Sequence, residues 1–145
     1  MSSFTYSEEQ SKDVEDYLAY ASAEERLSWL MERSYFHREL PRERCTAEGR
    51  IPGCLSGLWL EASYIDSRCL FAARSESEMV QGIVSFICDL YSGRSPHEIL
   101  TLGGALTDFL GLERLLSLTR KRAVLSTTSF ILSFAKRHDS TQLVA

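Results

Sequence analysis

The chain has 145 residues, with 16 Lys and Arg against 20 Asp and Glu, a net charge of −4, and 44% apolar residues. This length supports one domain with a buried core that folds without disulfides or a metal. The acidic balance argues against electrostatic binding of nucleic acid, and no apolar run is long enough to span a membrane. We expect a single domain over residues 1–145, with its core at about 8–137 and a flexible tail at 138–145.

The first predicted elements are two amphipathic helices. Apolar residues recur at helical spacing over residues 8–20 and again after Ser22. Ser22 and Glu25 have the spacing of a capping box, in which each side chain bonds the backbone N–H of the other residue. Residues 42–53 are rich in Arg, Glu, Gly and Pro and are expected to form a loop, with a short strand at 50–51.

A β-hairpin is predicted next. Residues 56–65 and 69–74 are bounded by turn residues and contain the aromatic and apolar side chains typical of strands. The Asp-Ser-Arg sequence at 66–68 is expected to form the turn between them. The hairpin with the strand at 50–51 gives an antiparallel sheet of about three strands.

Helices are predicted for the rest of the chain. Ser75 is expected to cap a helix over 76–91, whose apolar residues surround it on nearly every side, as in a central core helix. Gly82 in its interior costs about 1 kcal/mol relative to Ala, so we expect another backbone to approach it closely. Short helices follow, one of them at 103–110, and then a last helix over about 119–137. This order of elements predicts an α+β fold.

The four cysteines are Cys45, Cys54, Cys69 and Cys88. None forms a C-x-x-C pair and no histidine stands at zinc-finger spacing, so no metal site is predicted. Cys69 and Cys88 lie in apolar patterns and are expected to be buried, inert thiols. Cys45 lies in a charged stretch and is expected to be exposed. No targeting segment is recognised, so we expect the cytoplasm, where thiols stay reduced.

Cys54 has a different setting. It follows Pro52-Gly53 and precedes Ser56-Gly57. Proline fixes one φ angle and glycine allows a positive φ, so the thiol is expected on a turn before a strand, where chemistry can reach it. Cys54 is therefore a candidate reactive thiol; the alternative is a small apolar residue that closes a turn.

The segment 51–60, Ile-Pro-Gly-Cys-Leu-Ser-Gly-Leu-Trp-Leu, resembles the signature of the SufE family of sulfur-acceptor proteins. That signature has Gly-Cys-Gln-Ser followed by a Trp between hydrophobic residues. The likeness continues at Ser75 with residues 79–83 and at Tyr91 with residues 95–100, and it extends over about residues 8–137. The chain departs from the family pattern in three places. Leu55 replaces the usual Gln, Gly57 stands where Gln or a longer residue is common, and the usual Asp-Trp before the Arg of the second helix is absent.

The resemblance implies a small antiparallel sheet with helices packed on it. It also implies a protein that binds a pyridoxal-phosphate cysteine desulfurase, stimulates it, accepts persulfide sulfur and passes it to an Fe–S cluster scaffold. Such a protein is not a stand-alone enzyme and holds no cofactor or metal of its own. The sulfur-carrying residue matches Cys54. The expected loop residues and partner contacts are Gly53, Leu55, Ser56, Gly57, Glu76 and Arg120.

Two other functions stay open from the sequence. One is a regulatory module that binds a desulfurase without carrying sulfur. The other is a thiol redox protein, which needs a second cysteine to resolve the oxidised thiol. Cys45 is the loop cysteine available for that role.

Overall fold

The computed structural model describes residues 8–33, 40–54, 56–112 and 114–139. Two consecutive strands have helices before and after them along the chain. In order they are α1 (Glu8–Leu18), α2 (Ala23–Arg33), the 3₁₀ turn η2 (Arg42–Arg44), β1 (Leu58–Ile65), β2 (Arg68–Ser75), α3 (Glu78–Tyr91), α4 (Pro96–Leu102), α5 (Ala105–Asp108) and α6 (Leu118–His138). The predicted α+β fold class is confirmed. No helix in these ranges is long and apolar enough to cross a membrane.

The two strands form the predicted antiparallel hairpin, from the Leu58–Ser75 pair to the Ile65–Arg68 pair. The turn consists of two residues, Asp66 and Ser67, both with positive φ, as the tight turns that match the twist of a hairpin require. The turn is therefore one residue shorter than predicted, because Arg68 already pairs with Ile65.

The predicted third strand is reduced to a single bridge, between Arg50 and Trp59. The Ile51 amide donates to the Leu58 carbonyl oxygen at 2.8 Å, and Pro52 follows. Proline has no N–H to extend a ladder, and the chain turns away at this point. The sheet of the described residues thus has two strands rather than about three.

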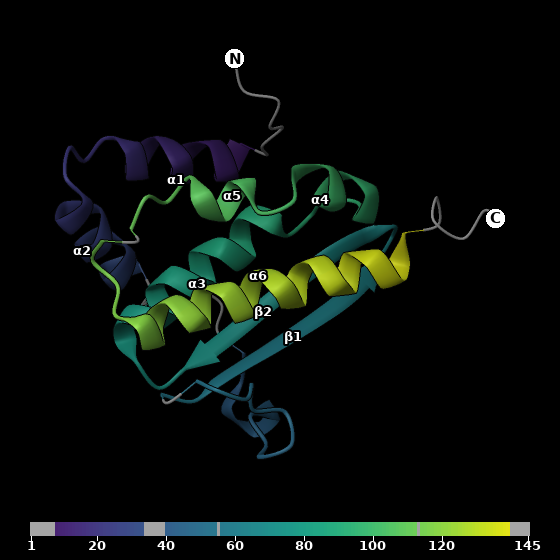
Figure 1. Ribbon diagram of the computed structural model, residues 1–145. Coiled ribbons are helices and arrows are strands. Elements are labelled where there is room, and N and C mark those ends of the chain that lie inside the picture. The colour runs from purple at the N-terminus through teal and green to yellow at the C-terminus, as the bar shows by residue number, and fades with distance from the viewer. Residues whose placement is uncertain (1–7, 34–39, 55, 113, 140–145) are drawn as a thin grey trace.

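One face of the hairpin is covered by α3 and α6 (Figure 1). On β2 the buried residues Cys69, Phe71 and Ala73 alternate with more exposed ones, so they point toward these helices. The Phe71 ring meets the Phe134 ring of α6 edge-on, with 5.8 Å between centroids. Trp59 pairs with Arg74 and lies on the opposite face. We call these the inner and outer faces of the hairpin.

Side-chain caps set most helix starts. Ser22 and Glu25 form the predicted capping box of α2. The prediction that Ser75 caps α3 is wrong, because Ser75 pairs with Leu58 as the last residue of β2. Ser77 caps the helix instead, and its side chain accepts from the Val80 amide. The extra rung of the hairpin delays the helix by two residues.

The last helix runs one residue beyond its predicted end. The His138 ring stacks on Tyr64 of β1, with 4.8 Å between centroids, and lies 4.3 Å from the Phe134 ring. His138 is half-buried and Asp139 is buried, so both residues, expected at the start of the tail, are packed. Residues 140–145 lie outside the described residues.

Gly82 of α3 lies against the backbone of α2, as predicted. A Cβ at this position would overlap the Leu30 carbonyl group, 2.7 Å from its carbon, and would lie 3.0 Å from the Met31 nitrogen. These atoms belong to the backbone of another helix and cannot rotate away. The missing side chain therefore sets how closely α2 and α3 approach.

Gly82→Ala is expected to lower the free energy of unfolding by about 1–3 kcal/mol, the usual cost of overpacking a core, although Ala favours an isolated helix. Urea denaturation measures the change. Gly104→Ala is the matched control: a Cβ there meets no atom within 4 Å, so we expect a change within about 0.5 kcal/mol. Equal stability of Gly82→Ala and the wild-type protein would contradict the close approach.

Candidate functional site

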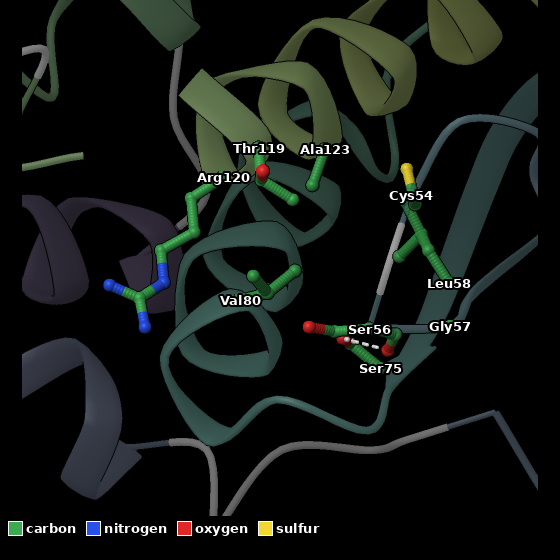
Figure 2. A pocket seen from close by; sticks show the side chains of 9 residues that line it. All are labelled: Cys54, Ser56, Gly57, Leu58, Ser75, Val80, Thr119, Arg120 and Ala123. Atoms are coloured by element: carbon green, nitrogen blue, oxygen red, sulfur yellow. Dashed lines mark hydrogen bonds between the residues drawn. The ribbon is translucent and has the colours of Figure 1, made fainter. Parts of the chain in front are cut away.

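Cys54 lies on the loop that joins Ile51 to Leu58, the first residue of β1. The loop is closed by the hydrogen bond from the Ile51 amide to the Leu58 carbonyl oxygen. The Cys54 side chain is only 8% exposed and belongs to the hydrophobic core. Figure 2 shows its sulfur directed toward α6. The expected turn is present, but its thiol is turned inward.

A small cavity lies beside the thiol, at the junction of the loop with α3 and α6. Its apolar walls are Leu58, Val80 of α3 and Ala123 of α6. The other residues that line it are Ser56, Gly57, Ser75, Thr119 and Arg120, most of them polar. The free space is about 10 Å³, roughly that of one water-sized sphere. The cavity can therefore hold about one atom beyond the thiol in surroundings that are mostly apolar.

The far end of the loop is tied to the residues that follow β2. The Glu76 amide donates to the Ser56 and Gly57 carbonyl oxygens at 3.2 and 3.3 Å. The Ser75 hydroxyl donates to the Ser56 carbonyl oxygen at 3.4 Å (Figure 2). The Glu76 carboxylate fills the position where a Gly57 side chain would be. Ser56, Gly57 and Glu76 thus form one contact that keeps the loop against the hairpin.

Arg120 lies at the cavity rim near the start of α6, where its backbone amide donates to the Ser117 hydroxyl that caps the helix. Its guanidinium points away from Cys54 in Figure 2. Gly53, Ser56 and Gly57 belong to the loop itself, Glu76 contacts Gly57, and Arg120 lines the cavity. Their role as partner contacts stays a prediction. Leu55, the other expected residue, lies outside the described residues.

Sequence reasoning missed the walls of the cavity. Val80 and Ala123 have no feature that separates them from other core residues. Ala123 stands three residues after Arg120, so the two lie on neighbouring parts of one helix surface. This spacing was the available signal. Which surface of α6 meets the loop depends on how the helix packs on the sheet.

The other thiols lie elsewhere. Burial raises the pKa of Cys69 to about 11 and also raises the pKa of Cys88. Cys45 is partly exposed, and the charges that act on its thiol include Arg74 and Glu61. Both belong to the outer face of the hairpin, whereas Cys54 lies on the inner side. In the described part of the chain, no group of three His, Cys, Asp or Glu side chains is arranged to hold a metal ion.

Comparison with known proteins decides the family. The SufE profile, described as an Fe-S metabolism associated domain, matches residues 11–135. The chain belongs to the SufE family. Its family is therefore one associated with Fe–S metabolism.

Several known proteins are similar to parts or most of this chain. An uncharacterized SufE-like protein of Rhizobium etli is 27% identical over 128 residues, which cover 85% of this chain and 86% of that protein. SufE-like protein 1, chloroplastic/mitochondrial, of Arabidopsis thaliana is 30% identical over 82 residues, 56% of this chain. Chloroplastic quinolinate synthase of Nicotiana tabacum is 37% identical over 59 residues, 39% of this chain. The chain spans between 8% and 22% of the length of these two plant relatives.

The SufE fold also has a counterpart among solved structures. The solution structure of a hypothetical protein from Thermus thermophilus superposes with a TM-score of 0.68 and 15% sequence identity. The match covers 89% of this chain and 94% of that protein. At this identity the likeness concerns the fold alone.

Iodoacetamide at pH 8 is expected to modify Cys45 and Cys54 of the native protein and to leave Cys69 and Cys88 intact until urea unfolds the chain. Cys54, Cys69 and Cys88 are all buried, but Cys54 lies on a loop, whereas Cys69 lies in β2 and Cys88 in α3. Burial raises the pKa of Cys69 and Cys88, which keeps them protonated, and the thiolate is the form that reacts. Peptide mapping by mass spectrometry measures the four rates. Labelling of Cys69 as fast as Cys45 under native conditions would show that this core is open.

Proposed function

We propose that this SufE chain accepts a sulfur atom on Cys54 from the persulfide of a cysteine desulfurase, stimulates that enzyme, and passes the sulfur to an Fe–S cluster scaffold. The observation that carries the proposal is the position of Cys54. Its thiol lies on a loop with glycines on both sides and borders an apolar cavity with room for about one further atom.

The proposed transfer needs no other reactant. The Cys54 thiolate attacks the terminal sulfur of the donor persulfide, a new S–S bond forms, and the donor S–S bond breaks. The donor cysteine leaves as a thiolate, so the sulfur moves without net oxidation or reduction. As in thiol–disulfide exchange, the attacking sulfur must reach its target directly. With 8% of its surface exposed, Cys54 has to leave the cavity to meet a donor.

The cavity suits the loaded state. A persulfide adds one atom to the thiol, and the free space of about 10 Å³ lies beside that thiol. Leu58, Val80 and Ala123 give this space apolar walls, and it is too small to admit a reductant such as dithiothreitol. We therefore expect the loop to swing out on the partner and to retract with its sulfur after transfer.

The rim supplies the surface that a partner would meet. Arg120 offers a guanidinium beside the cavity, and Glu76 offers a carboxylate at the other side of the loop. Because the Arg120 side chain points away from Cys54 and the Glu76 carboxylate lies against Gly57, we assign both to partner contacts rather than to chemistry. The C-terminal segment 111–145 carries six basic and two acidic residues, which favours an acidic surface on the partner.

The arrangement disfavours a thiol redox protein that uses Cys45. Cys45 neighbours charges of the outer face, whereas Cys54 neighbours α3 and α6 on the inner side. The hairpin lies between these two surroundings. A disulfide needs Cα atoms within about 7 Å, which a pair on opposite faces reaches only after rearrangement.

Cys54→Ser is expected to abolish sulfur acceptance while binding to the desulfurase is retained, because serine keeps the size of the side chain and removes the nucleophile. The measurement is intact-mass spectrometry after incubation with a cysteine desulfurase, pyridoxal phosphate and cysteine. The wild-type protein gains the mass of one sulfur atom, which a reductant removes, and Cys45→Ser behaves the same.

Two outcomes would overturn the proposal. Sulfur on the Cys54→Ser variant would place the carrier thiol elsewhere. Full stimulation of the desulfurase by Cys54→Ser, with no sulfur on the wild-type protein, would instead show a regulatory module that carries none.

A further inference from the structure

The two ends of the Cys54 loop are held very differently. Gly53 and Gly57 both have a positive φ, of 83° and 51°. A Cβ on Gly53 would meet no atom within 4 Å, whereas a Cβ on Gly57 would lie 2.9 Å from Cη2 of Trp59. The Gly53 end is therefore open, and the Gly57 end is packed against the Trp59 indole.

The Trp59 indole is fixed from the side away from the loop. Its Nε1–H donates to the Thr46 carbonyl oxygen at 2.7 Å. The Arg50 guanidinium carbon lies 6.0 Å from the ring centre, and the Arg50 backbone bridges to Trp59. Thr46 itself belongs to a turn that is closed by hydrogen bonds from the Gly49 amide. The ring thus joins the turn at 46–49 to the loop of Cys54.

We infer that Trp59 is a positioning residue, which keeps Cys54 in its cavity by fixing the Gly57 end of the loop. With the indole in place, Gly57 stays where its carbonyl oxygen accepts from the Glu76 amide. When the indole moves away from Thr46, Gly57 gains room and the thiol swings out about Gly53. The consequence for sulfur carriage rests on the proposed function, but the effect on the thiol does not.

Trp59 connects the two faces of the hairpin. Trp59 pairs with Arg74 on the outer face, and the thiol that it controls lies on the inner side, next to α3 and α6. A partner that displaces the turn at 46–49 would release the thiol without touching it. Cys54 is then retracted while the indole bonds Thr46, and it is released when the indole moves away.

The test measures the rate at which iodoacetamide modifies Cys54, with no sulfur donor present. Trp59→Leu keeps an apolar residue on the strand but removes both the Gly57 contact and the bond to Thr46. We expect Cys54 to be modified about five- to thirtyfold faster, the factor that corresponds to losing one or two ordinary interactions. Trp59→Phe retains a shorter ring and is expected to fall between this variant and the wild-type protein.

Cys69 and Cys88 report the rest of the fold in the same samples, because both are buried in the core. Trp29→Phe is the matched control, since Trp29 packs against Phe86 of α3 and Cys54 should keep its wild-type rate there. An unchanged Cys54 rate in Trp59→Leu would overturn the inference. If Trp59→Leu also exposes the core thiols, Trp59→Phe decides: faster modification of Cys54 alone supports the inference, and a wild-type rate overturns it.

A second readout separates this inference from the proposed function. If both hold, Trp59→Leu still accepts sulfur from the desulfurase but loses it to dithiothreitol faster than the wild-type protein. If the wild-type protein takes no sulfur at all, the proposed function fails, while faster modification of Cys54 still supports the role of Trp59.

Discussion

The structure depends on burying α3 from almost every direction. Eleven of its fourteen residues are buried, so it needs neighbours on each side, and it packs against β2, α2, α5 and α6. Gly82 lets α2 approach to backbone contact, and Phe86 receives the rings of Tyr17 and Trp29. Burying apolar surface stabilises the fold in proportion to the area removed from water. The helices that flank α3 therefore pack on the same face of the hairpin.

The position of the thiol follows from this packing. Val80, in the first turn of α3, and Ala123, near the start of α6, meet at the point where the chain turns into β1. A loop that ends at Leu58 passes over this junction, and Cys54 fills most of the space left there. The residual cavity is small because core side chains pack densely. The site is thus the edge of the core rather than a cleft between separate parts.

Local signals in the sequence predicted the elements whose causes are local. The Ser22 and Glu25 capping box and the hairpin turn at Asp66 each follow from a few neighbouring residues. The glycine at position 82 indicated a close approach, but only the fold shows that α2 makes it. The N-cap at Ser75 failed because pairing with Leu58, seventeen positions earlier, extends the strand. Similarly, one rung with Trp59 replaces the third strand. Pairing with a distant segment therefore explains the first error, and the proline that follows Ile51 explains the second.

The same distinction between local and long-range causes applies to the candidate site. Cys54 and its glycines stand in one short motif, so sequence alone singled them out. The walls formed by Val80 and Ala123, and the indole of Trp59 beneath Gly57, depend on how helices and strands meet. Whether Arg120 points toward the thiol also depends on that arrangement, and it points away. A pattern in the chain shows where chemistry is available but not what surrounds it.

The central claim is that Cys54 carries sulfur in a shelter formed by the fold. The most direct test compares the rates at which dithiothreitol removes the sulfur from persulfidated Cys54 in the native protein and in urea. The account predicts that native protein loses its sulfur much more slowly, because the cavity excludes the reductant. Equal rates in the two states would contradict the shelter and with it this account of how the chain works.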